Sequence, residues 1–118
     1  MEFCGPTIDD PGIDNGIYIA KQLSAALDKG YNAYLYWWSV SQAGTPGTPT
    51  NRQALVDFKT DGSYTFTKRL YTIGQYSRFL KPGQYKISAQ SGDSDLIVTA
   101  AKDIDTGKVN IVVINDSP

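Results

Sequence analysis

The spacing of apolar residues changes near Gly83, from a helical period before it to alternation after it. A first helix is predicted to follow Gly12, with Asp14 or Asn15 as its cap and Gly30 as its stop. Its core-facing residues recur three or four positions apart, as one face of a helix requires. These residues are Gly16, Ala20, Leu23 and Leu27.

A second helix is predicted from about Lys68 to Leu80, and Lys81-Pro82-Gly83 should end it. Two basic residues begin it, Lys68 and Arg69. They are expected to form a solvated face, with anion binding as the alternative. The core-facing side is expected to contain Leu70, Ile73, Ser77 and Leu80.

The region 39–67 before this helix is poor in apolar residues and too long for an ordinary connection. Only the short run Ala54 to Phe58 interrupts it. The turn Asp61-Gly62, next to Tyr64 and Phe66, predicts a small hairpin within it. Long connections of this kind are usually functional or disordered.

After Gly83 three apolar runs alternate with polar residues, which predicts three strands. Turn residues separate the runs at Ser91-Gly92-Asp93 and at Asp105-Thr106-Gly107. The pattern is typical of an antiparallel meander. The three sets of apolar residues are Tyr85, Ile87 and Ala89, then Leu96, Val98 and Ala100, then Val109, Ile111 and Val113.

The run YNAYLYWWSV at 31–40 combines aromatic and aliphatic residues at both alternating sets of positions. This pattern predicts one strand of a parallel sheet that is buried on both faces. With the extended start Glu2-Phe3-Cys4 and the first helix, the order is strand, helix, strand. Loops after parallel strands carry ligand sites, so Trp37 and Trp38 are candidates for stacking on sugar rings. Tyr36 is a further candidate, although packing in the core is the more ordinary role for such a residue.

Composition and charge narrow the function classes. Eleven basic and twelve acidic residues give a net charge of −1, so no cationic surplus favours nucleic acid or an anionic membrane. No apolar run is long enough for a membrane span, and no signal-peptide pattern is present. Histidine is absent, which excludes Ser-His-Asp catalysis and most catalytic zinc sites. Neither a metal nor a cofactor is expected, and the lone Cys4 is expected to be an inert thiol.

The predicted elements form an incomplete architecture. Two helices with one or two parallel strands do not close a sheet, and three antiparallel strands leave edges and one face to cover. We therefore expect the chain to be part of a larger protein, cut at both ends.

Five segments, taken together, resemble the C-terminal third of family 30 glycoside hydrolases, which include xylanases and glucanases. The most specific part runs from Lys68 to Tyr85. The resemblance implies that 1–82 forms the last strand-helix units of a (β/α)8 catalytic barrel and that 83–118 forms the first strands of a β-sandwich. It also implies secretion. The segments are EFCGP, IDNGIYIAKQLSAAL, YNAYLYWW, KRLYTIGQYSRFLKPGQYKISA and VNIVVIN.

The same resemblance assigns roles to single residues. Glu2 falls on the catalytic nucleophile at the end of the seventh barrel strand, although Met1 stands where the family has Thr or Ser. Trp37 and Trp38 close the eighth strand. The family's acid/base glutamate belongs to the fourth strand, and Glu2 is the only glutamate in this chain.

A retaining glycosidase needs two carboxyl groups, one as nucleophile and one as proton donor. Asp9, Asp10 and Asp14 are typical of turns and helix caps, so the second role is expected to be vacant. The chain alone is then inactive, and its partners are a polysaccharide substrate, xylan or β-glucan, and the missing N-terminal part. The alternatives are a non-catalytic carbohydrate-binding module and a structural sandwich domain without a ligand.

Overall fold

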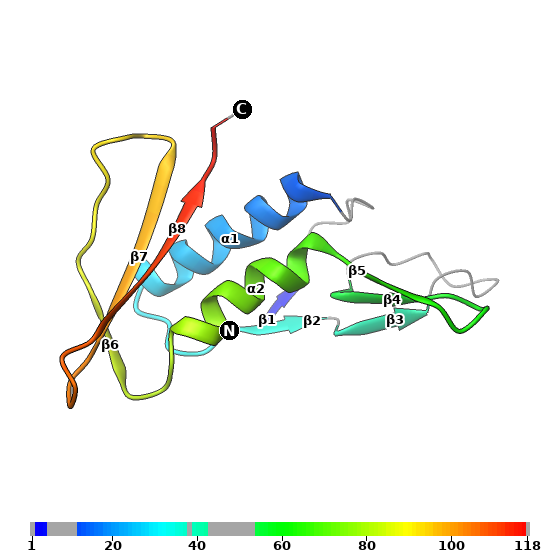
Figure 1. Cartoon of the computed structure of the whole chain (residues 1–118), viewed down its shortest axis with the longest axis horizontal. Helices are drawn as coiled ribbons and strands as arrows, with labels where there is room; N and C mark the ends of the chain where they lie inside the picture. The colour runs from blue at the N-terminus through cyan, green and yellow to red at the C-terminus, as the bar shows by residue number, and fades with distance from the viewer. Residues whose placement is uncertain (1, 5–11, 38, 43–53, 118) are drawn as a thin grey trace.

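Two helices lie side by side at the centre of the molecule, α1 (Ile13–Asp28) and α2 (Lys68–Phe79) (Figure 1). One three-stranded sheet packs against the pair, and two smaller sheets, of two and three strands, complete the fold. The result is a mixed α/β structure, as predicted. The computed structural model describes residues 2–4, 12–37, 39–42 and 54–117.

The start of α1 differs from the prediction. The helix begins at Ile13 with Gly12 as its N-cap, so the expected cap at Asp14 or Asn15 is wrong. Asp14 lies instead in the first turn, where its negative charge is favourable near the exposed N–H groups of the helix. The predicted stop is confirmed, because Gly30 has a φ of 82°, a conformation in which a side chain would be strained.

The buried side of α2 also differs from the prediction. Ser77 is exposed, whereas Tyr76 is buried and its hydroxyl donates a hydrogen bond of 3.3 Å to the carbonyl of Ala20. Ile73 and Leu80 pack beside it, as expected. Tyr76 thus joins α2 to the facing helix α1 through a buried ring and a hydrogen bond.

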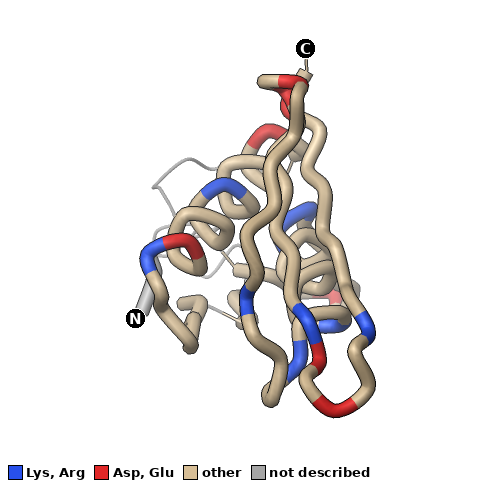
Figure 2. Tube along the Cα trace, turned by 90° about the vertical axis from the view of Figure 1, so that its left-hand side faces the viewer, with Lys and Arg blue, Asp and Glu red and all other residues tan. Residues whose placement is uncertain are grey.

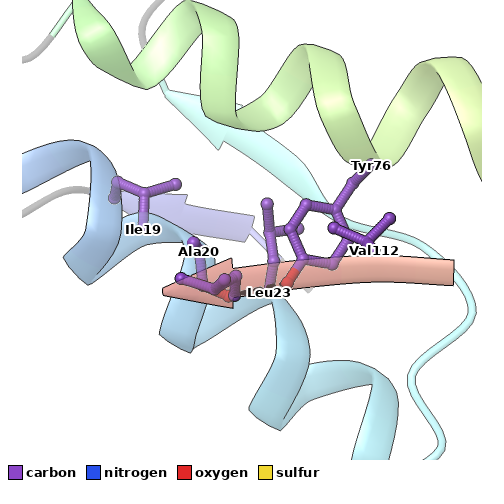
Figure 3. Close-up of a cluster of buried hydrophobic side chains, with 6 residues drawn as sticks. Ile19, Ala20, Leu23, Tyr76 and Val112 are labelled. Carbon is purple, nitrogen blue, oxygen red and sulfur yellow. Dashed lines mark hydrogen bonds between the residues drawn. The ribbon is translucent and has the colours of Figure 1, made fainter. Parts of the chain in front are cut away.

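The core lies where the two helices meet the three-stranded sheet (Figure 3). The ring of Tyr76 lies beside Val112, and Leu23 and Ala20 approach from α1. The predicted core-facing stripe of α1 is confirmed, with Ile19 added to it. The cluster consists of Ile19, Ala20, Leu23, Tyr76, Val112 and Ile114.

The predicted antiparallel meander is confirmed as β6 (Gln84–Ile87), β7 (Leu96–Asp103) and β8 (Val109–Asn115), with β7 in the middle. Val112 and Ile114 of β8 face the helices, and the alternate residues face outward. The alternating apolar residues that predicted β8 thus lie on its outward face. These residues, Val109, Ile111 and Val113, are about half exposed.

Polar contacts attach the meander to the helices. The hydroxyls of Ser24 and Thr99 lie 3.0 Å apart in the buried interface, and the side-chain amide of Asn110 donates to the carbonyl of Phe79. Ion pairs join Lys86 to Asp28 and Lys21 to Asp116. Figure 2 shows basic and acidic positions interspersed around one end of the meander, without segregation by sign.

The long connection before α2 contains a small sheet, the hairpin sheet, made of β3 (Val40–Gln42), β4 (Val56–Phe58) and β5 (Tyr64–Phe66). The predicted hairpin is confirmed, since β4 and β5 are antiparallel and Gly62 has a φ of 84° in the turn. Strand β3, which pairs parallel to β4, is an element that the sequence pattern did not predict.

Helices α1 and α2 lie close together at Gly16. A Cβ atom there would lie 3.1 Å from Oγ1 of Thr72 and 3.2 Å from Cβ of Lys68. We expect Gly16→Val to lower the free energy of unfolding by about 1–3 kcal/mol, because the added atoms push α2 away. Gly74→Ala is the control, since no atom of the described residues lies within 4 Å of its Cβ position. It should raise stability by about 0.5–1 kcal/mol in the same denaturant titration.

Alkaline pH should destabilise the fold through Tyr76. Burial raises the pKa of its hydroxyl, whereas an unfolded tyrosine ionises at about pH 10. The contribution of the protonated Tyr76 hydroxyl to the free energy of unfolding is therefore complete below about pH 10, and it is lost as the pH rises through the folded-state pKa. Denaturant unfolding at stepped pH should show a shallower alkaline loss for Tyr76→Phe than for wild type or for Tyr85→Phe. Equal slopes for all three proteins would contradict this assignment.

Candidate functional site

The first two strands form the parallel pair that the sequence predicted. Strand β1 (Glu2–Cys4) pairs with β2 (Leu35–Trp37), and helix α1 connects them. In the register of the pair, Glu2 lies opposite Leu35 and Cys4 opposite Trp37. Because the strands are parallel, their carboxyl ends meet at one edge, where ligand sites of parallel α/β proteins lie.

The aromatic strand is shorter and more open than predicted. Only Leu35–Trp37 has strand structure, and the segment 31–34 precedes it without pairing. Leu35 is 65% exposed and Trp37 is 50% exposed, so the prediction of a strand buried on both faces is wrong. Among the described residues β1 is its only strand neighbour, and the helices cover only one face of the pair.

The two faces of β2 separate the candidate aromatic residues. Tyr36 is partly buried and packs against the core cluster, as its ordinary role predicts. Trp37 belongs to the opposite face, with Leu35, because alternate residues of a strand share a face. Trp37 is half exposed, at the end of the strand. Trp38 lies outside the described residues.

The backbone also fixes the position of Glu2. This residue lies in β1, two positions before Cys4, and Cys4 is the register partner of Trp37. Glu2 and Trp37 thus occupy neighbouring strands with an offset of two residues. The predicted nucleophile and the predicted sugar platform belong to one strand pair, although the sequence separates them by a helix.

Two of the described carboxylates have a shifted pKa, and neither fits the role of a proton donor. The pKa of Asp61 is lowered by hydrogen bonds from the hydroxyl and backbone of Ser63, and the pKa of Asp103 by hydrogen bonds from Thr106. A general acid at neutral pH needs the opposite shift. Both aspartates stabilise turns. Among the described ranges no group of three potential metal ligands was found, and no described helix is long and apolar enough to cross a membrane.

The burial of Arg69 shows that the prediction of a solvated basic face at the start of α2 is wrong for this residue. Its side chain is fully buried, and Nη2 donates a 3.4 Å hydrogen bond to the carbonyl of Ala54. Its Nε and Nη1 atoms have no hydrogen-bond partner among the described residues. The adjacent Thr67 hydroxyl donates to Ala54 and Leu55 instead of capping the helix. These long-range contacts hold the helix start against the connection, and the sequence gives no local signal for them.

A cluster of exposed aromatic residues lies on the hairpin sheet and the first turn of α2. We call Phe58, Tyr64, Phe66 and Tyr71 the aromatic surface. Their side chains are between 41% and 57% exposed. Successive ring centroids lie 5.7, 5.1 and 6.4 Å apart, so the four rings form one continuous row. Sequence reasoning used Tyr64 and Phe66 only as a hairpin signal, because only the strand register brings all four rings together.

No protein-family model matches the chain, but solved structures do. The chain is similar to the catalytic domain of GH30 xylanase C from Talaromyces cellulolyticus, with a TM-score of 0.71 and 23% identity over 97% of this chain and 25% of that one. It is also similar to SrfJ from Salmonella typhimurium, with a TM-score of 0.71 and 17% identity over 97% of this chain and 32% of that one.

The chain thus spans a quarter to a third of the length of the solved structures that it matches. At these identities the likeness establishes the fold. It confirms the resemblance drawn from the sequence, because nearly the whole chain has the fold of one part of a GH30 xylanase catalytic domain.

Proposed function

We propose that this chain supplies the C-terminal part of a retaining glycoside hydrolase that acts on a β-linked wall polysaccharide such as xylan or β-glucan. The observation that carries the proposal is the parallel β1-β2 pair, in which Glu2 and the half-exposed Trp37 lie on adjacent strands. The match to a quarter of a xylanase catalytic domain supports it.

The proposal assigns 1–82 to the last units of a (β/α)8 barrel and 83–118 to the first strands of a sandwich. Two features support this division. The helices cover one face of β1-β2, and Leu35 and Trp37 are exposed on the other, which is the face that the remaining strands of a closed barrel would enclose. The outward face of the meander keeps apolar residues such as Ile111 exposed, which a second sheet would cover.

In the proposed mechanism the carboxylate of Glu2 attacks the anomeric carbon and forms a covalent glycosyl-enzyme intermediate. A second carboxyl group, roughly 5–5.5 Å away, protonates the leaving oxygen and then activates water. That group comes from the preceding part of the barrel. The exposed indole of Trp37 supplies an apolar face for the C–H side of a sugar ring. The chain alone is therefore inactive, and the complete protein, called the full enzyme below, is secreted to reach its substrate.

The test of this function is hydrolysis by the full enzyme and by a Trp37 variant. The full enzyme should release reducing sugar from xylan or β-glucan. Trp37→Ala should lower kcat/KM by roughly tenfold or more, because a ring that stacks on the substrate is lost. Trp37→Phe, which keeps an aromatic ring, should retain most of the activity.

Two results would count against this assignment. An unchanged kcat/KM for Trp37→Ala would remove Trp37 from the substrate site. Saturable glycan binding by the full enzyme without any turnover would favour the alternative, a non-catalytic carbohydrate-binding module. Tyr36→Phe, which preserves core packing, separately reports whether the hydroxyl of Tyr36 contributes to substrate binding.

A further inference from the structure

The aromatic surface is built by strand register and the adjoining helix. Phe58 of β4 pairs directly with Tyr64 of β5, and Phe66 follows Tyr64 on the same face two residues later. Tyr71 extends the row from α2, with its ring nearly perpendicular to that of Phe66, at 89°. Contacts among the rings therefore hold them in place without burying them.

Local polar contacts stabilise the hairpin that carries the row. Asp61 accepts hydrogen bonds from the backbone N–H and the hydroxyl of Ser63, at 2.9 and 2.6 Å. The backbone N–H of Lys59 donates to the carbonyl of Ser63, and the backbone N–H of Gly62 donates to the carbonyl of Lys59, which closes the turn. At the other end, the ammonium group of Lys68 lies 5.9 Å from the centre of the Tyr71 ring, a cation–π distance. The rings are thus presented on a structured element.

The four neighbouring aromatic rings form an exposed apolar patch, and contiguous patches of this kind mark binding sites. The surroundings favour a glycan over a protein. Lys59, Asp61, Ser63 and Lys68 are exposed around the row, whereas lysine and aspartate are depleted from protein interfaces. Tyr64 and Tyr71 also carry hydroxyls. Flat apolar rings bordered by hydrogen-bonding groups match the alternating C–H faces and hydroxyls of a sugar chain.

The position of the row also favours a glycan. Strand β3 begins at Val40, shortly after β2 ends at Trp37, so the hairpin sheet continues from the carboxyl end of β2 (Figure 1). The aromatic surface is therefore connected through the hairpin sheet to the edge that holds the proposed sugar site. It is distant from the meander, which lies at the other end of the molecule.

We propose that Phe58, Tyr64, Phe66 and Tyr71 form a second glycan-binding surface, which holds a stretch of β-linked polysaccharide outside the catalytic centre. This inference rests on the proposed function for the class of ligand. It adds a site that needs neither Glu2 nor Trp37. Its role is to hold the polymer against the protein while another part of the same polymer occupies the catalytic centre.

The experiment is a titration of this chain with xylan and β-glucan oligosaccharides, read by calorimetry and by retardation in polysaccharide-containing native gels. Wild type should bind at least one of the two glycans. The double variant Tyr64→Ala/Tyr71→Ala should bind roughly tenfold more weakly, because two stacking rings are lost. Tyr85→Ala is the matched control, since Tyr85 is an equally exposed tyrosine on the meander. Circular dichroism and thermal unfolding verify folding, and Tyr64→Phe/Tyr71→Phe, which keeps the rings, should retain binding.

The outcomes separate this inference from the proposed function. Trp37→Ala should leave most of the glycan binding by the aromatic surface intact. This binding requires no turnover, so the result does not depend on whether the full enzyme is active. Equal binding by wild type and the folded Tyr64→Ala/Tyr71→Ala variant would overturn the inference. Absence of glycan binding by wild type would also overturn it. If sedimentation then shows self-association that the double variant abolishes, the aromatic surface binds a second copy of the chain and not a glycan.

Discussion

Replacing Glu2 with glutamine in the full enzyme is expected to lower kcat for xylan or β-glucan by at least about a thousandfold, as removal of a nucleophile does in other enzymes. The amide keeps the size of the side chain but cannot attack the anomeric carbon. Initial rates of reducing-sugar release measure the effect. KM should change far less than kcat, because glutamine preserves the shape of the site.

The control for Glu2→Gln is a carboxylate of helix α1 that has only a structural role. Asp14→Asn removes a charge from the first turn of α1 and should leave kcat within about twofold, at a stability cost of about 0.3–1 kcal/mol. A Glu2→Gln enzyme with wild-type kcat would exclude Glu2 as the nucleophile.

Arg69→Met is expected to leave the free energy of unfolding unchanged or to raise it by about 1–2 kcal/mol, whereas Arg69→Ala should lower it by about 2–4 kcal/mol. The guanidinium is fully buried, and two of its nitrogens lack a hydrogen-bond partner within the part of the chain that the structure describes. Methionine fills much of the same volume without burying a charge. Alanine leaves a cavity instead.

Denaturant titration of the chain and its two Arg69 variants provides the measurement. Arg69→Lys serves as the control that keeps a charge at this position; it should be less stable than Arg69→Met, because its ammonium group is also buried. If Arg69→Met is as destabilised as Arg69→Ala, the guanidinium stabilises the fold through its charge, and the account of Arg69 as a volume-filling residue is wrong.

The elements that local signals define were predictable from the sequence. Helical spacing located α1 and α2, Asp61-Gly62 located the hairpin turn, and alternation located the meander. These features depend on backbone conformations and on amphipathic patterns that neighbouring residues determine. The strand-helix-strand order of β1, α1 and β2 followed from the same signals and placed Glu2 near the aromatic strand.

Features that depend on distant contacts were not predictable. The apolar pattern of β2 indicated burial on two faces, but only Tyr36 meets the helices, and Trp37 remains half exposed. Arg69 has the charge of a surface residue and is buried because the chain near Ala54 folds against the start of α2. The aromatic surface likewise requires the pairing of β4 with β5 before its rings become neighbours.

The most direct test of the central claim is covalent trapping in the full enzyme with a fluorosugar substrate whose glycosyl-enzyme intermediate is long-lived. Peptide mass spectrometry then identifies the labelled residue. The account predicts one glycosyl group on the carboxylate of Glu2 and no label on the Glu2→Gln enzyme. A label on another carboxylate, or an active enzyme that forms no glycosyl-enzyme intermediate, would contradict it.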